Sequence, residues 1–135
     1  MRAQPYLFFH GRCAEAFDFY RRVLGANIEA LIRFGDMPGS PVERSQMIMH
    51  AALRIGDTVI LGSDGSGAGA APFSGFAISL QVETDAQANQ FFAALGEGGK
   101  VEVPMMATPF ASRFGKISDR FGTPWMIVNQ SQPGR

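Results

Sequence analysis

The chain has 135 residues, enough for one domain or two small halves with a common core, and 46% of it is hydrophobic. Its 12 basic residues balance its 12 acidic ones. No basic stretch is long enough to follow a phosphate backbone, so we expect no nucleic-acid partner. No apolar run approaches membrane-spanning length, and no apolar signal core is recognisable, so we expect no membrane partner. The single cysteine, Cys13, excludes an internal disulfide and favours a cytoplasmic location.

Four strands and one helix are predicted in the first half of the chain. A short apolar run predicts a strand at residues 6–9. Apolar residues at helical spacing then predict a helix that starts at Cys13 and stops at Gly25. The remaining elements are strands at 28–34, 47–55 and 58–61, with a Gly- and Pro-rich loop at 35–45.

The second half repeats this order. A strand at 76–82 is followed by a capping-box pattern from Thr84 to Gln87, which starts a helix that stops near Gly96. Further strands are predicted at 100–106, 113–118 and 124–129. The fold class is therefore α+β, with two βαβββ modules in tandem whose sheets form a curved wall around a cavity, with the helices outside. The predicted boundaries are about 1–64 for module one, 65–74 for a linker and 75–131 for module two.

Several segments of the chain resemble the vicinal oxygen chelate superfamily, which contains glyoxalase I, bleomycin and fosfomycin resistance proteins and extradiol dioxygenases. The opening resemblance lies in residues 5–9, 16–20 and 23–25. A narrower resemblance to the PhnB-like branch lies in residues 49–57, in 98–101 with Pro104, in 113–115, and in 119–122 with 124–125. Some PhnB-like sequences carry a methyltransferase label, but no Gly-rich nucleotide loop follows a strand here. The resemblance implies the glyoxalase/bleomycin-resistance fold and a homodimer.

Metalloenzymes of this superfamily hold their metal with one His or Glu from each of four central strands. The resemblance places the four equivalent positions near Pro5, at Leu61, near Phe76 or Ala77, and at Met126. None of these residues has an imidazole, a carboxylate or a thiolate, so we expect no metal at this place and no cofactor. The sequence thus argues against glyoxalase I, fosfomycin transferase and dioxygenase activity.

Two polar residues are the leading candidates for binding a ligand. His50 interrupts an apolar strand and, if its face lines the cavity, can bind a ligand or move a proton; otherwise it is a hydrogen-bonded histidine at a sheet edge or a dimer contact. Arg113 precedes a strand that should border the cavity, where its guanidinium suits a carboxylate or phosphate. Its ordinary alternative is an ion pair with Asp64 or Asp119.

The other candidates are weighed in the same way. Asp64 lies at the mouth of the cavity or is a turn residue beside Gly65. Phe110, in a loop, is expected at the cavity, whereas Trp125 belongs either to the cavity wall or, more simply, to the core. Cys13 is an activated thiol at a helix start or a small buried residue of the core. The cavity candidates are His50, Arg113, Phe110, Leu61, Met126, Trp125 and Asp64.

The sequence therefore favours a metal-independent protein that binds an unidentified small organic molecule. One alternative is a metal-dependent lyase, isomerase or dioxygenase with an atypical ligand set, for which His10, His50, Asp64 and Glu102 are the available donors. Another alternative is a structural or protein-binding module, which would show a flat apolar patch and a filled cavity. The fold alone does not choose among these functions.

Overall fold

A computed structural model describes residues 1–39, 42–65 and 73–130 of the chain. The chain divides into two compact units, Met1–Ala71 and Pro72–Arg135, and each described part has the predicted order of one strand, one helix and three strands. The predicted linker at 65–74 lies largely outside the described residues. Unit 1 contains β1 (Tyr6–Phe8), α1 (Cys13–Leu24), β2 (Asn27–Arg33), η1 (Phe34–Asp36), η2 (Val42–Arg44), β3 (Ile48–Ile55) and β4 (Thr58–Ser63). Unit 2 contains β5 (Ile78–Gln81), α2 (Asp85–Gly96), β6 (Lys100–Thr108), β7 (Ala111–Ser118) and β8 (Pro124–Asn129).

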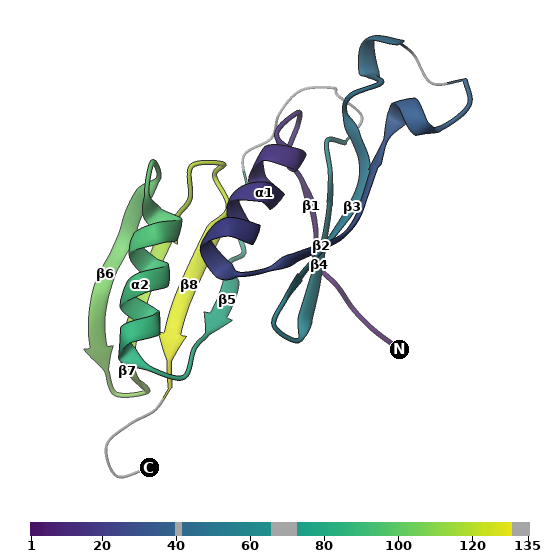
Figure 1. The fold of residues 1–135 in the computed structure, drawn as a ribbon. Coiled ribbons are helices and arrows are strands. Elements are labelled where there is room, and N and C mark those ends of the chain that lie inside the picture. Colours follow the sequence, from purple (N-terminus) through teal and green to yellow (C-terminus); the bar gives the residue numbers. More distant parts are fainter. Residues whose placement is uncertain (40–41, 66–72, 131–135) are drawn as a thin grey trace. The chain divides into compact units, whose positions relative to one another are not determined.

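The sheet of unit 1 has the strand order β1-β4-β3-β2, in which β1 runs parallel to β4 and the other neighbours are antiparallel. Helix α1 packs on one face of this sheet (Figure 1). The core between helix and sheet is made of fully buried apolar side chains: Cys13, Ala16, Phe17, Tyr20, Leu53 and Ile60. Burial of this helix face stabilises the unit, because each large apolar side chain contributes roughly 1.5–3 kcal/mol when it leaves water.

The sheet of unit 2 repeats this topology with the order β5-β8-β7-β6, and again only the first pair is parallel. Helix α2 packs on one face of it (Figure 1). Its core contains Ala88, Leu95, Ile117, Trp125 and Ile127. The predicted two-module α+β fold is therefore confirmed. In the described residues, neither helix has the length and apolar character needed to cross a membrane.

The structure differs from the sequence prediction mainly at the ends of elements. Strand β4 continues to Ser63, because its parallel pairing with β1 extends from Tyr6–Leu61 to Phe8–Ser63. Strand β5 starts only at Ile78, and the segment predicted as a loop at 35–45 contains two short 3-10 turns. Pairing partners distant in the sequence set these boundaries, and they leave no local signal.

A single buried carboxylate joins three segments of unit 1. Asp64, 2% exposed, accepts hydrogen bonds through Oδ1 from the backbone N–H groups of Gly11 at 2.8 Å and Cys13 at 2.9 Å. Its Oδ2 accepts a third from the N–H of Ile48 at 2.7 Å. Residue Arg12 at the N-cap of α1 provides no side-chain cap, so the distant Asp64 satisfies the free N–H groups at this helix start. The same carboxylate fixes the beginning of β3.

Unit 2 uses a buried aspartate in a comparable way. Asp119 accepts hydrogen bonds through Oδ1 from the N–H groups of Phe121 at 2.8 Å and Thr123 at 3.0 Å. Its Oδ2 accepts one from Trp125 Nε1 at 2.9 Å. The carboxylate therefore closes the turn between β7 and β8 and holds the indole of Trp125 in the core.

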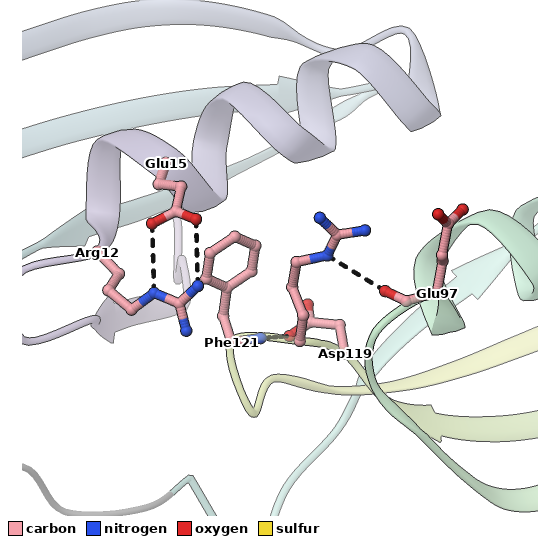
Figure 2. Close-up of polar contacts among 6 residues, drawn as sticks. Arg12, Glu15, Glu97, Asp119 and Phe121 are labelled. Carbon is pink, nitrogen blue, oxygen red and sulfur yellow. Dashed lines mark hydrogen bonds and ion pairs between the residues drawn. The ribbon is translucent and has the colours of Figure 1, made fainter.

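The helices of the two units differ in how their ends are satisfied. Helix α2 has the predicted local cap, in which Thr84 Oγ1 accepts from the N–H of Gln87 at 3.0 Å and Gln87 Oε1 accepts from the N–H of Glu83 at 3.1 Å. The first turn of α1 instead carries an exposed ion pair between Arg12 and Glu15 at 3.1 Å (Figure 2). After α2, the guanidinium of Arg120 donates to the Glu97 carbonyl, also drawn in Figure 2. Such exposed contacts contribute little, and Asp64 and Thr84 are the effective caps.

Removal of the Asp64 carboxylate should destabilise the protein strongly. We expect Asp64→Ala to lower the free energy of unfolding by about 3 kcal/mol or more, because three backbone N–H groups lose their acceptor, two of them in buried bonds. Urea unfolding followed by circular dichroism measures the change. Asp57→Ala, in the exposed turn before β4, is the matched control and should stay within about 0.5 kcal/mol. Equal effects of the two variants would contradict this role of Asp64.

Candidate functional site

Each sheet has one face against its helix and one face that the helix leaves uncovered. The helix face of unit 1 is marked by Gly62, where an added Cβ would lie 2.8 Å from Phe17 Cζ of α1. In unit 2 it is marked by Gly115, where an added Cβ would lie 2.7 Å from Phe92 of α2. Side chains alternate along a strand, so the neighbours of these glycines belong to the opposite face. The face opposite the helix is where binding residues are expected, because the core fills the helix face.

The uncovered face of unit 1 contains an aromatic group joined to the predicted histidine. Tyr6 and Phe8 of β1 are 39% and 48% exposed, and their ring centroids are 5.1 Å apart. Tyr6 Oη and His50 Nδ1 are hydrogen-bonded at 3.2 Å, and the two rings are 5.8 Å apart. Because β4 lies between β1 and β3 in the sheet, the Tyr6 side chain passes across β4 to reach His50. His50 thus lies on a sheet face with exposed aromatic rings.

The surface beside this group is apolar. Register pairs Tyr6 with Leu61, Leu61 with Ala52, and Ala52 with Ala30, so a row of side chains crosses all four strands. The row has small alanines at its β3 and β2 positions, next to His50. Further along β3, Arg54 Nε is hydrogen-bonded to Glu29 at 2.6 Å, and this bond raises the pKa of the guanidinium. The carboxylate of Glu29 thereby balances the charge of Arg54. The row of side chains itself offers apolar contact to a ligand.

The uncovered face of unit 2 is also partly apolar. Phe110, 51% exposed, packs edge-on against Phe114 with centroids 5.4 Å apart. Met106 of β6 pairs with Phe114 and is 48% exposed. Met126 of β8 pairs with Lys116 and is half-buried. Phe110 and Met126 are thus the predicted candidates that unit 2 places on this face.

Three other predicted candidates lie elsewhere in the fold. Arg113 shares the helix face of β7 with Gly115, because the pairing with β8 is regular from Arg113 to Ser118. Trp125 is fully buried in the core, as its simpler interpretation predicts. Asp64 is buried and holds α1 and β3 by hydrogen bonds. The first and last of these assignments depend on contacts across the sheet that the local sequence does not reveal.

The neighbourhood of Arg113 is the start of α2. Its Nη1 donates to the Ser112 carbonyl at 3.0 Å, and the acidic group nearby is Asp85. Asp85 accepts from the Ser112 hydroxyl at 2.6 Å and from Asn129 Nδ2 at 2.9 Å. These hydrogen bonds, that of Ser112 first, lower the pKa of Asp85, and the Arg113 charge acts in the same direction. Arg113 therefore supports the start of helix α2.

An open hollow of about 250 Å³ lies at the turn between β3 and β4, away from the residues predicted for the site. Its lining is mainly polar and comprises Arg2, Ala3, Gln4, Arg54, Asp57, Thr58 and Val59. It lacks aromatic side chains, and its Arg54 is already bonded to Glu29. We therefore regard the aromatic face of unit 1 as the better candidate for an organic ligand.

The side chains present do not fit the metal centre of the superfamily's metalloenzymes. Leu61 pairs with Tyr6 in the sheet of unit 1, and Met126 pairs with Ser79 in the sheet of unit 2. None of these four side chains has an imidazole, a carboxylate or a thiolate. Among residues 1–39, 42–65 and 73–130, no three His, Cys, Asp or Glu side chains converge on one point. Of the alternative donors, Asp64 already binds three N–H groups.

Two βαβββ units in tandem are the architecture of the glyoxalase/bleomycin-resistance fold. The family model of the Glyoxalase/Bleomycin resistance protein/Dioxygenase superfamily matches residues 2–127. The chain is 37% identical to protein YjdN of Escherichia coli over 145 residues, covering 98% of this chain and 99% of that protein. The chain therefore belongs to this superfamily.

Solved structures agree with the assignment. Protein PA1353 of Pseudomonas aeruginosa is 40% identical and superposes with a TM-score of 0.90, with 98% of this chain and 99% of that chain covered. The PhnB protein of Bacillus cereus shares the fold at 20% identity, with a TM-score of 0.83 and coverage of 96% and 99%. The predicted resemblance to the PhnB-like branch is thereby confirmed at the level of the fold.

Sequence reasoning missed Tyr6, Phe8 and Phe114 as candidate site residues. Tyr6 and Phe8 alternate with the buried Leu7, which is the pattern of a strand with two different faces. A run of consecutive apolar residues hides this alternation, because both faces of the strand carry large side chains. The local sequence therefore does not reveal that Tyr6, the partner of His50, lies on the uncovered face.

Cys13 is a buried core residue, in agreement with the simpler prediction for it. Its side chain is fully buried, and burial, together with the nearby charge of Asp64, raises the pKa of the thiol to about 12. The thiolate is the reactive form. We therefore expect negligible labelling by iodoacetamide at pH 7.5 and complete labelling in 6 M urea, measured by mass spectrometry. Because Cys13 is the single cysteine, rapid labelling of the folded protein would contradict this assignment directly.

Proposed function

We propose that the protein is a metal-independent binding protein for a small organic molecule and that the uncovered face of the unit 1 sheet is its main binding surface. The observation that carries the proposal is the group formed by Tyr6, Phe8 and His50. Large aromatic rings that stay about 40–50% exposed on a regular sheet offer apolar area to a ligand. The half-buried His50 adds a polar anchor on the same face.

The composition of this face favours a flat, largely apolar ligand. The Tyr6 and Phe8 rings supply area for stacking, and such aromatic contacts contribute roughly 0.5–1.5 kcal/mol beyond the burial of surface. Beside them, Ala30 and Ala52 leave room above the sheet, because their side chains end at Cβ. One face thus combines stacking surface, space and a single polar contact, which is the usual composition of a small-molecule site.

Independence from metal is part of the proposal. It is supported by the apolar residues at Leu61 and Met126 and by the hydrogen bonds that already occupy Asp64. Binding through apolar contacts and one hydrogen bond requires no Lewis acid. A sequestering or resistance-type role, in which the protein holds a molecule without changing it, needs no further group.

Truncation of Phe8 should weaken ligand binding without unfolding the protein. We expect Phe8→Ala to raise the dissociation constants of small aromatic probes about fivefold to tenfold, because roughly 1–1.5 kcal/mol of ring contact is lost. A panel of fluorinated benzene derivatives, followed by fluorine NMR, provides the measurement. The melting temperature should change little, since nearly half of the side chain is exposed.

Val42→Ala is the matched control, because Val42 is 85% exposed and lies on the short turn η2. Added Zn²⁺ or Mn²⁺ should leave the dissociation constants and the melting temperature unchanged. Protein purified without a metal-binding tag or chelator should contain no stoichiometric divalent metal. Near-stoichiometric metal in the wild type that is lost in His50→Ala would contradict metal independence and indicate a metal-dependent function. Equal effects of Phe8→Ala and Val42→Ala on the dissociation constants would show that the uncovered face of unit 1 is not the binding surface.

A further inference from the structure

The Tyr6–His50 hydrogen bond determines which nitrogen of the histidine can meet a ligand. Tyr6 Oη contacts Nδ1 at 3.2 Å. His50 Nε2 has no hydrogen-bond partner among the described residues. Unlike His10 Nδ1, it is not a fully buried nitrogen. Nε2 lies on the uncovered face of the sheet, beside the aromatic rings of β1. A ligand on this face meets Nε2 first.

The direction of the hydrogen bond follows from the chemistry of the two groups. A phenol can donate or accept, whereas a neutral imidazole has one donor nitrogen and one acceptor nitrogen. A phenol O–H is the stronger donor of the pair, and an unprotonated imidazole nitrogen is the stronger acceptor. Tyr6 accordingly donates to Nδ1, and the histidine proton then resides on Nε2.

We propose that Tyr6 is a positioning residue that fixes His50 in the Nε2–H form, so that the site selects planar organic molecules bearing a hydrogen-bond acceptor such as a carbonyl or carboxylate oxygen. This inference rests on the proposed function. The acceptor oxygen meets the Nε2–H group, and the planar part of the ligand packs against Tyr6 and Phe8. A ligand whose polar group can only donate finds no acceptor at Nε2.

The surroundings of His50 support an acceptor ligand. Its partner on β2 is Ile32, and the alanine pair Ala52–Ala30 follows on the same face, so these neighbouring side chains are apolar. Arg54, the next cation along this face of β3, is bound to Glu29. The imidazole N–H is thus a polar group beside the aromatic rings, and a neutral carbonyl suits it as well as a carboxylate does.

The tautomer can be measured without any ligand. The chain has two histidines, His10 and His50, so the imidazole ¹⁵N signals of the folded protein can be assigned with a His10→Asn variant, in which asparagine tolerates the positive φ of 52° at this position. At a pH above the histidine titration, we expect Nε2 of His50 to carry the proton in the wild type. In Tyr6→Phe we expect a mixture of the two tautomers. A proton on Nδ1 in the wild type would overturn the inference.

Selectivity is measured with acetophenone and benzoate as acceptor probes and benzylammonium as the donor-only probe. We expect both acceptor probes to bind more tightly than benzylammonium and to shift the Nε2 signal, and we expect Tyr6→Phe to weaken them about fivefold. His50→Gln, which keeps an N–H donor near the Nε2 position, should retain more affinity than His50→Ala. Preference for benzylammonium would overturn the assigned ligand class. Absence of binding by all three probes, with the predicted tautomer present, would instead count against the proposed function while leaving the role of Tyr6 intact.

Discussion

The buried carboxylates of Asp64 and Asp119 are the contacts on which the rest of each unit depends. Each accepts three N–H hydrogen bonds from segments that the hydrophobic core alone would leave free to shift. Buried charges are tolerated only when they are fully hydrogen-bonded, and these two are satisfied by rigid donors. In unit 1 the carboxylate sets the start of α1 against the sheet. The helix then covers one face and leaves the other face without a helix.

This arrangement separates stability from function within one sheet. The helix face is filled so closely that Gly62 has no room for a side chain. The opposite face keeps Tyr6 and Phe8 in partial contact with water, which costs stability unless a ligand covers them. The proposed binding surface is therefore a direct consequence of the same strand alternation that builds the core. In β1, Leu7 packs in the core, whereas its neighbours Tyr6 and Phe8 lie on the proposed binding surface.

Much of the fold follows from local sequence. The spacing of apolar residues predicts α1 from Cys13, which the structure confirms. The Thr84–Gln87 pattern predicts the cap of α2, in which the structure shows Thr84 Oγ1 accepting from the N–H of Gln87 and Gln87 Oε1 accepting from the N–H of Glu83. The strand ends were less well predicted, since Ser63 joins β4 only because β1 lies alongside it. The repeated order of elements gave the two-module organisation because each copy needs the same helix to cover the same sheet face.

The candidate site was predicted only in part. His50 and Phe110 lie on uncovered faces, but Asp64 and Arg113 are occupied in holding helix starts. The contact of Asp64 with Cys13 spans 51 residues of sequence, and no local pattern announces it. Tyr6 was overlooked for the converse reason: its function depends on a contact across an intervening strand. Local chemistry identifies candidate side chains, but the register of the sheet decides which of them share a face.

Amide chemical-shift mapping tests directly whether the uncovered face of unit 1 is the binding surface. The protein, labelled with ¹⁵N, is titrated with acetophenone, and the shifted amides are placed on the structure. We expect the largest changes on β1, on β3 around His50 and on β4 around Leu61. Changes confined to the helices, or to the polar hollow at the turn between β3 and β4, would contradict this expectation.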